Sequence, residues 1–364
     1  MAQTVFIAGG GSGGHIYPAL AVARSLLENN SELKIHFVGS SQGLETHIIP
    51  DQGFPLHLLP IGRLNHNVDL SKRIKTLISL PLSLLVSLYF LFYYRPSLLF
   101  GVGGFASAPV LFVGSLLGFK TVIWEPNVYP GLANRWLSKF VSYGLVVFEE
   151  AKEVLKMKRM KKVGLPVRKE IEILSNEEHS PGQPLKVLVF GGSQGAQGLN
   201  FSVCEAICRG GSWLDDVMII HQTGRLNFPQ VSQKYKQFQA KVEVWEYFST
   251  IHEQYRWADL VFCRAGASTI AELAAAKKPA VLIPAPFVAD NHQQKNAEAL
   301  VKEGAAKMVI QKDFSADKFI EIVHQFKKSQ MELDLLSKNI CKFYRPNAAN
   351  ETAQLLLAEL RGGH

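Results

Sequence analysis

The chain is poor in cysteine, with four among 364 residues, which excludes a disulfide scaffold. Cys204 and Cys208 lie four residues apart, but no second cysteine or histidine pair follows at zinc-finger spacing. The sequence also lacks an Asp-x-Asp pair and, before its first apolar run, the basic segment of a signal peptide. We therefore expect free thiols in a reducing compartment and no bound metal.

Charge is scarce as well, because Asp, Glu, Lys and Arg make up 19% of the residues, and it is unevenly distributed. Residues 1–170 contain 18 basic and 10 acidic side chains, whereas residues 171–364 contain 21 of each. The formal net charge of +8 therefore belongs to the first half. This asymmetry indicates an anionic partner for that half, with a solvated basic surface as the alternative.

Residues 76–94 carry no charge, and as a helix they would be about 28 Å long, close to the thickness of a bilayer. Pro81 interrupts this run, and strand-like segments on both sides require a crossover helix between them. A mildly polar stripe also follows the helical spacing, formed by Thr76, Ser79, Ser83 and Ser87. We expect a helix that packs on a sheet and has an apolar, interfacial outer side.

The order strand, glycine loop, helix opens the chain at residue 4 and returns at residue 185, and strands alternate with helices after both. This predicts an α/β protein of two Rossmann-like, doubly wound parallel-sheet domains that face a cleft. The domains are expected at residues 1–170 and 185–346, with a linker at 171–184 and a C-terminal helix at 347–364 that packs back on the first domain. The later strands are expected at residues 34–38, 56–59, 98–102, 120–124, 145–148, 217–220, 242–245, 260–263, 280–283 and 307–310.

The first glycine loop has the spacing Gly9-x-Gly11-x-x-Gly14 of a dinucleotide fingerprint. The second strand ends without the acid that holds a ribose, which disfavours a nicotinamide dehydrogenase, although a diphosphate at the helix N-terminus remains compatible. His15 follows in the first helical turn, where a protonated imidazole is disfavoured. It is a candidate general base, and a capping or packing histidine is the alternative.

Two features of the second half, and one at the end of the first half, point to a nucleotide. The loop at residues 191–196 offers backbone N–H groups to a phosphate, unless it is only a tight turn. Residues 263–272 are mostly small, and Glu272 either holds ribose hydroxyls or is a favourable first-turn charge. Arg168, at the end of the first half, is expected to meet a phosphate across the cleft. Asp290 and His292 have no further ligand at metal-binding spacing.

In their order along almost the whole chain, these motifs resemble the MurG family, the bacterial UDP-N-acetylglucosamine–lipid I N-acetylglucosaminyltransferases of peptidoglycan synthesis. The resemblance implies a GT-B fold and an inverting transfer without metal or cofactor. It implies UDP-GlcNAc as donor on the second domain and a lipid-linked MurNAc-pentapeptide as acceptor on the first. It also implies a role in cell shape and division, and a peripheral place on the cytoplasmic side of the cell membrane. The expected partners are an anionic membrane surface and cell-wall synthesis proteins, and no nucleic acid.

The family's functional positions carry over to individual residues of this chain. The catalytic base falls on His15. The donor-binding positions fall on Ser12, Gly13, Gly14, Asn127, Arg168, Ser193, Phe248, Ala267, Ser268, Thr269, Ile270, Ala271, Glu272 and Gln293. The chain departs from the family at Trp124 and Pro126, which replace His and Gln, and at Phe248, where an aliphatic residue is common.

Two other functions remain open at this point. The chain could be a GT-B transferase for another lipid or a polyketide acceptor, or a nucleotide-sugar-binding protein without turnover. Retention of His15 argues against the second.

Overall fold

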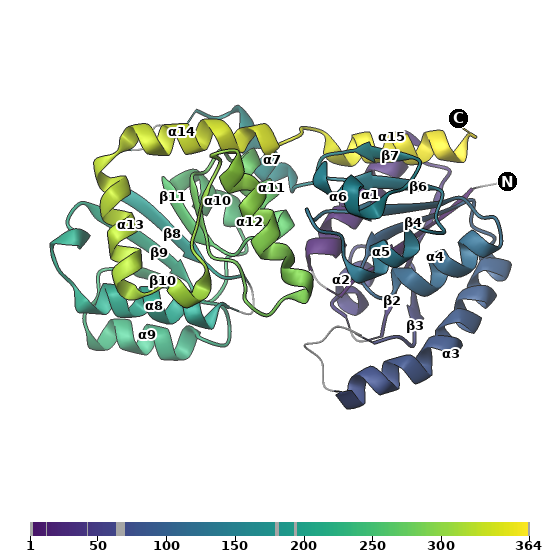
Figure 1. Ribbon diagram of the computed structural model, residues 1–364, viewed down its shortest axis with the longest axis horizontal. Coiled ribbons are helices and arrows are strands. Elements are labelled where there is room, and N and C mark those ends of the chain that lie inside the picture. Colours follow the sequence, from purple (N-terminus) through teal and green to yellow (C-terminus); the bar gives the residue numbers. More distant parts are fainter. Residues whose placement is uncertain are drawn as a thin grey trace. The chain divides into compact units, whose positions relative to one another are not determined.

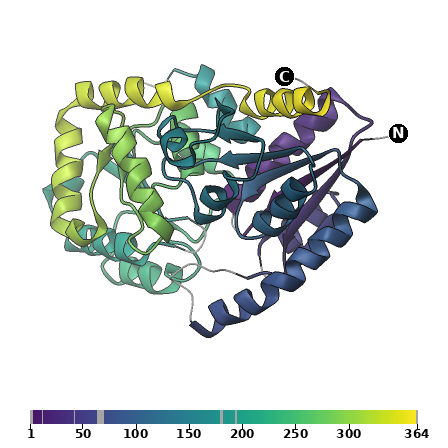
Figure 2. The same cartoon turned by 45° about the vertical axis from the view of Figure 1, so that its right-hand side comes forward.

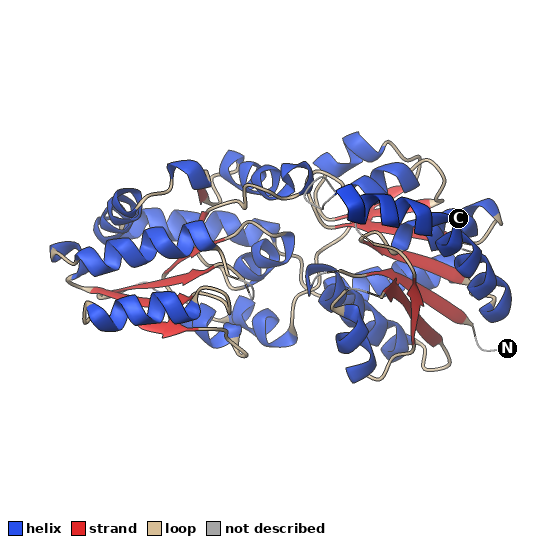
Figure 3. Cartoon of the chain, turned by 90° about the horizontal axis from the view of Figure 1, so that it is seen from below, coloured by secondary structure: helices blue, strands red, loops and turns tan. Residues whose placement is uncertain are grey.

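The structure is a computed structural model that describes residues 3–11, 13–41, 43–62, 70–178, 182–192 and 195–362. The chain divides into two compact units, Met1–Val167 with Arg345–His364, and Arg168–Tyr344. In each unit helices cover both faces of a parallel sheet, which confirms the expected α/β class (Figure 3).

The first unit is built on a seven-stranded sheet in the order β3-β2-β1-β4-β5-β6-β7. Its strands are β1 (Thr4–Gly9), β2 (Lys34–Ser40), β3 (Leu56–Leu59), β4 (Leu98–Gly103), β5 (Thr121–Glu125), β6 (Tyr143–Val146) and β7 (Met160–Lys162). The strand order reverses between β1 and β4, and open α/β sheets bind ligands at the carboxyl ends of strands beside such a point. Strand β7 was not predicted from the sequence.

The helices of the first unit form two groups (Figures 1 and 2). They are α1 (Gly13–Asn29), α2 (Glu45–Asp51), α3 (Leu70–Tyr94), α4 (Ser107–Leu116), α5 (Leu132–Leu137), α6 (Glu150–Leu155) and α15 (Ala348–Leu360). Helix α3 contacts α4, α4 contacts α5 and α5 contacts α6, so these four form one row on one face of the sheet. Helix α1 contacts α2 and α15, and Asn29 donates to Asn350 over 2.8 Å.

The second unit has a six-stranded sheet in the order β10-β9-β8-β11-β12-β13. Its strands are β8 (Leu185–Phe190), β9 (Val217–Gln222), β10 (Glu243–Trp245), β11 (Leu260–Cys263), β12 (Ala280–Leu282) and β13 (Lys307–Met308). Its helices are α7 (Lys169–Glu172), α8 (Gln197–Arg209), α9 (Phe228–Gln237), α10 (Ile251–Trp257), α11 (Ala267–Ala275), α12 (His292–Lys302), α13 (Ala316–Lys328) and α14 (Gln330–Ile340). All five strands expected after β8 are present.

The segment 171–184 differs from the expected linker. Its first residues complete α7 and continue into the 3₁₀ turn η1 (Ile173–Asn176), where Ile171 and Leu174 are buried. Apolar side chains at these positions attach the segment to the second unit, and Arg168 belongs to that unit too. The chain returns to the first unit at Arg345.

Helix α3 has its polar stripe on the buried side and exposes several large apolar residues on its outer side. Thr76, Ser83 and Ser87 are buried, and the Ser83 and Ser87 hydroxyls donate to carbonyl groups four residues earlier, over 3.0 and 2.7 Å. These bonds satisfy the hydroxyls within the helix, so the stripe can face the protein. The outer side exposes Ile78, Leu82, Leu85, Tyr89, Phe92 and Tyr93. In the described part of the chain, no helix has the length and apolarity required to cross a membrane.

Candidate active site

In the first unit, the expected functional residues follow two strands that flank β4. His15 follows β1 in the first turn of α1, and Asn127 follows β5. Strand β4 lies between β1 and β5 and ends at Gly103. Gly13 and Gly14 begin α1, and Ser12 lies outside the described residues.

Two glycine segments interlock beside His15. A Cβ atom added to Gly103 would lie 2.9 Å from Cε1 of His15, and one added to Gly104 would lie 2.7 Å from the carbonyl oxygen of Gly10. Both residues have a positive φ, which glycine adopts without strain. Sequence reasoning missed Gly103 and Gly104, although adjacent glycines after a predicted strand were a usable signal.

Glu45, on α2, binds the first glycine loop through its carboxylate. Its Oε2 accepts from the Gly11 N–H over 2.7 Å, and its Oε1 accepts from the Ser40 N–H and hydroxyl over 3.0 and 2.9 Å. No acid was recognised in the sequence at the end of β2. Glu45 nevertheless brings a carboxylate to that end of the strand, from a position five residues further along the chain. Because its oxygens bind the chain's own backbone, it differs from the ribose-binding acid of a dinucleotide site.

Asn127 is held by the buried carboxylate of Glu125. Oε1 of Glu125 accepts from the backbone N–H of Asn127 over 2.9 Å and from its side-chain amide over 3.0 Å. Oε2 accepts from the Gly131 N–H over 3.0 Å and from Asn134 over 2.9 Å. Burial raises the pKa of the Glu125 carboxyl, and these hydrogen bonds oppose the rise. The network fixes the loop that follows β5.

In the second unit, Glu272 of α11 is held by two donors. Nη2 of Arg168 lies 3.2 Å from its Oε1, and the Tyr255 hydroxyl donates to its Oε2 over 3.0 Å. Burial raises the pKa of the Glu272 carboxyl, and the Arg168 charge and the Tyr255 hydrogen bond oppose that rise. Arg168 therefore meets a carboxylate within its own unit, which corrects the expectation that it reaches over from the first domain.

Two side chains fix the loop that follows β12. Gln293 accepts from the Ala285 N–H over 2.9 Å. Arg264 donates to the carbonyl groups of Ile283 and Pro284 over 2.9 and 3.2 Å, and burial lowers the pKa of its guanidinium to about 10. Arg264 thus joins the loops that follow β11 and β12, a role that the sequence did not reveal.

Residues 267–272, the expected donor-binding run, form the first turns of α11. Ile270 and Ala271 are buried, whereas Ala267, Ser268 and Thr269 are partly exposed at the N-terminus of the helix. That end of α11 follows the carboxyl end of β11 and presents backbone N–H groups, which favour an anion.

The loops after β8 and β10 are joined through Gln222. Its amide donates to the Gly192 carbonyl over 3.1 Å and to the Glu246 carbonyl over 3.3 Å. Phe248 is buried with its ring 5.7 Å from that of Trp245, while Trp245 and Tyr247 are exposed. Ser193, the expected phosphate-binding hydroxyl, lies outside the described residues.

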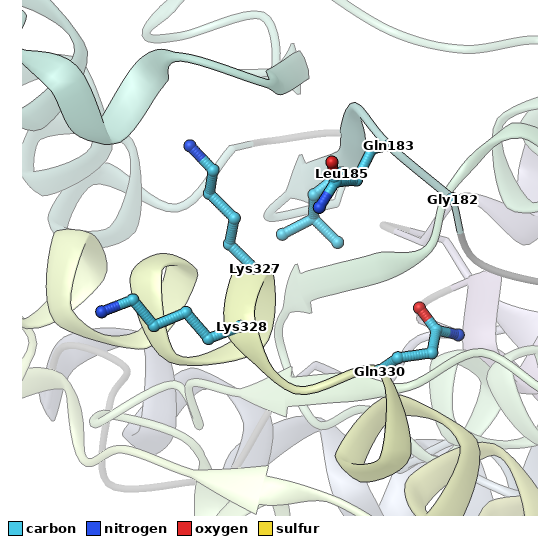
Figure 4. A pocket seen from close by; sticks show the side chains of 6 residues that line it. All are labelled: Gly182, Gln183, Leu185, Lys327, Lys328 and Gln330. Atoms are coloured by element: carbon cyan, nitrogen blue, oxygen red, sulfur yellow. The ribbon is translucent and has the colours of Figure 1, made fainter.

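A hollow of about 270 Å³ opens elsewhere on the second unit (Figure 4). Leu185 begins β8, so this hollow lies at the amino end of that strand, opposite the edge that carries Glu272. Its lining consists of Gly182, Gln183, Leu185, Lys327, Lys328 and Gln330. It brings together none of the expected site residues, and we assign it no catalytic role.

Comparison with known proteins agrees with this arrangement. Residues 5–143 match the glycosyltransferase family 28 N-terminal domain, and residues 186–352 match the glycosyltransferase family 28 C-terminal domain. A solved structure of MurG from Acinetobacter baumannii superposes with a TM-score of 0.78 at 25% identity, over 98% of this chain and 99% of that chain. A UDP-glucose:anthocyanidin 3-O-glucosyltransferase in complex with UDP shares the fold, with a TM-score of 0.69 at 11% identity over the whole of both chains.

The chain is also similar to a Bdellovibrio bacteriovorus protein, with 42% identity over 98% of this chain and 99% of the relative. A Carboxydothermus hydrogenoformans protein is 37% identical over 97% of both chains. Both are named UDP-N-acetylglucosamine–N-acetylmuramyl-(pentapeptide) pyrophosphoryl-undecaprenol N-acetylglucosamine transferase. The chain therefore belongs to glycosyltransferase family 28 and, within it, to the MurG family, with the GT-B fold.

Proposed function

We propose that this protein transfers N-acetylglucosamine from UDP-GlcNAc to the 4-hydroxyl of MurNAc in undecaprenyl-pyrophosphoryl-MurNAc-pentapeptide, with inversion at the anomeric carbon. The near full-length similarity to transferases named for this reaction carries the proposal. Its support within the structure is the placement of candidate residues at the carboxyl ends of both sheets.

The second unit binds the donor. Glu272 accepts hydrogen bonds from the ribose hydroxyls, and the exposed rings beside Phe248 line the uracil. The N–H groups that begin α11 and the loop containing Ser193 bind the diphosphate. Arg168, whose side chain is 42% exposed, is free to turn from Glu272 towards the same phosphates. Gln293 supports the site by fixing the loop at Ala285.

The first unit binds the acceptor and supplies the base. His15 takes the proton of the acceptor hydroxyl as its oxygen bonds to the anomeric carbon. The bond from that carbon to the diphosphate oxygen breaks on the opposite face, and UDP leaves with the electron pair. Arg168 and the helix N-terminus stabilise the charge that develops on the diphosphate, which is the work that a metal ion does in other transferases. The loop fixed by Glu125 keeps Asn127 in place.

The first unit also provides a surface that fits a bilayer. The row α3, α4, α5 exposes further apolar side chains besides those of α3, namely Leu116, Leu117, Leu132, Trp136 and Phe140. Lys139 is exposed between Trp136 and Phe140, and α6 continues the row into a basic segment that includes Lys156, Lys158 and Lys161. Lys72, Arg73 and Lys75, which precede the uncharged run at residues 76–94, have side chains outside the described part.

Exposed apolar side chains favour binding to a membrane because they can be buried in it. Basic residues favour an anionic membrane, and each one near the surface contributes about 1 kcal/mol to the free energy of binding. We infer that the protein docks peripherally on the cytoplasmic face, where a lipid-linked acceptor is reached without leaving the membrane. Wall-synthesis proteins remain candidate partners on this surface.

The turnover test is release of UDP from UDP-GlcNAc in the presence and absence of a lipid-linked MurNAc-pentapeptide. We expect release only with the acceptor, and a strongly raised donor KM in Glu272→Ala. Equal release of UDP with and without the acceptor, or stronger binding of ADP than of UDP, would contradict the proposal.

A further inference from the structure

The carboxylate of Glu272 has two partners of very different kinds. Arg168 is charged and has 42% of its side chain exposed, so solvent and ligands reach it. Tyr255 is completely buried on α10, and its ring meets that of Phe190, at the end of β8, edge to face with the centroids 6.0 Å apart. The phenol thus has a fixed position, whereas the guanidinium is able to change partners.

This difference matters when a nucleotide binds. If Arg168 turns to the diphosphate, Tyr255 is the remaining donor among the contacts described for the Glu272 side chain. A carboxylate has about four acceptor positions on its two oxygens, so one hydrogen bond from Tyr255 leaves enough for two ribose hydroxyls. Removal of that bond would leave a partly buried carboxylate that takes up a proton more readily once Arg168 has turned away, and a protonated carboxyl is a weaker acceptor for the ribose hydroxyls.

We propose that Tyr255 is a positioning residue for ribose recognition: through Oε2 it holds the Glu272 carboxylate ready to accept from the nucleotide's hydroxyls. This inference rests on the proposed function, in which Glu272 binds the ribose. It makes Tyr255 a determinant of selectivity for nucleotides that carry ribose hydroxyls, although its own hydroxyl does not touch the nucleotide.

The experiment measures dissociation constants for UDP and for 2′,3′-dideoxy-UDP, which lacks both hydroxyls. The variants are Tyr255→Phe, which removes one oxygen atom and keeps the ring, and Tyr235→Phe as its matched control. Tyr235 is a buried phenol of the same unit whose hydroxyl lies 2.7 Å from Nδ1 of His221, away from Glu272. Melting temperatures establish that each variant is folded.

We expect the wild-type protein to bind UDP about 10- to 100-fold more tightly than the dideoxy analogue, because hydrogen bonds to a charged group are lost. In Tyr255→Phe this preference should fall to less than about fivefold, with the affinity for the analogue nearly unchanged. The Tyr235→Phe variant should keep the wild-type preference.

Two results would overturn the inference alone: a Tyr255→Phe variant with the full preference, or one that loses both nucleotides equally, as a merely structural residue would. If the wild-type protein bound UDP and the dideoxy analogue equally well, Glu272 would not bind the ribose hydroxyls. That outcome contradicts the proposed donor site itself and is visible before any variant is made.

Discussion

At the scale of single residues, His15 is the side chain on which the proposed chemistry depends. His15→Ala should lower kcat about 10²–10⁴-fold and leave the affinity for UDP nearly unchanged, because a general base acts on the transition state and the contacts proposed for the ribose and the uracil lie on the other unit. Steady-state kinetics with a lipid-linked acceptor and a separate UDP titration measure the two quantities. His47→Ala, an exposed histidine of the same unit, is the control. Near-normal turnover in His15→Ala would make His15 a packing residue.

His221 predicts a pH dependence of stability. It is fully buried between Tyr235 and Asn200, and burial lowers its pKa from the ordinary 6.5 to about 3. The unfolded chain therefore binds a proton at this histidine below about pH 6.5 that the folded state does not, and the contribution of His221 to stability falls as the pH decreases from 7 towards 3. Between pH 7 and 5 the loss should be about 2 kcal/mol.

The measurement is urea unfolding of the wild-type protein and of His221→Asn at both pH values. The variant should be less stable at pH 7 and should lose about 2 kcal/mol less on acidification. An identical pH dependence in both proteins would contradict a neutral, buried His221.

At the scale of elements, the glycine loop, β2 and α2 are joined through Glu45. A Cβ atom added to Gly39 would lie 2.6 Å from Cγ of Glu45, so Gly39→Ala should displace the carboxylate and cost about 1–3 kcal/mol of unfolding free energy. Gly131→Ala is the matched control, because nothing lies within 4 Å of its added Cβ. Equal stability of the two variants would show that Glu45 does not fill the space beside Gly39.

Helix α3 is the element that tests membrane docking. The protein should co-sediment with anionic vesicles at low salt. Binding should weaken as the salt concentration rises, because salt screens the basic charges. Polar substitution of Leu82, Leu85 and Tyr89 should lower binding several-fold. Exposed Leu335, on α14 of the other unit, provides the control Leu335→Ser. Protein that stays in solution with anionic vesicles at low salt would contradict docking.

Most strands were predictable because buried parallel strands are continuous apolar runs, whereas the short, half-exposed β7 lacks that signal. The apolar outer side of α3 was expected from the sequence, but the burial of its polar stripe was not, because hydroxyl groups bonded to the helix backbone can be buried. Within the uncharged run at residues 76–94, Leu91 is buried, and Leu88 and Phe90 are half-buried. The contact of Glu45 with Gly11 joins residues 34 positions apart, which no local pattern reveals.

In the candidate site, too, some residues were recognisable from the sequence and others were not. Glu272 was recognisable as an acid at the start of a helix after a strand, but its pairing with Arg168 and Tyr255 depends on packing between α7, α10 and α11. Gln222 and Arg264 act through backbone carbonyls of other loops, so their roles follow from the folded chain alone. Ser12 and Ser193 remain predictions from the family resemblance.

At the scale of the whole molecule, the two units bind two substrates and should release UDP and a lipid-linked disaccharide together. The most direct measurement is incubation of the protein with UDP-GlcNAc and a lipid-linked MurNAc-pentapeptide in excess EDTA, with the linkage of the product determined by NMR. We predict equal amounts of UDP and of a β-1,4-linked disaccharide. We expect the reaction to proceed in EDTA, because Arg168 and helix N-termini stabilise the leaving diphosphate without a metal ion. An α linkage, no disaccharide, or activity that EDTA abolishes and magnesium or manganese restores would contradict the account.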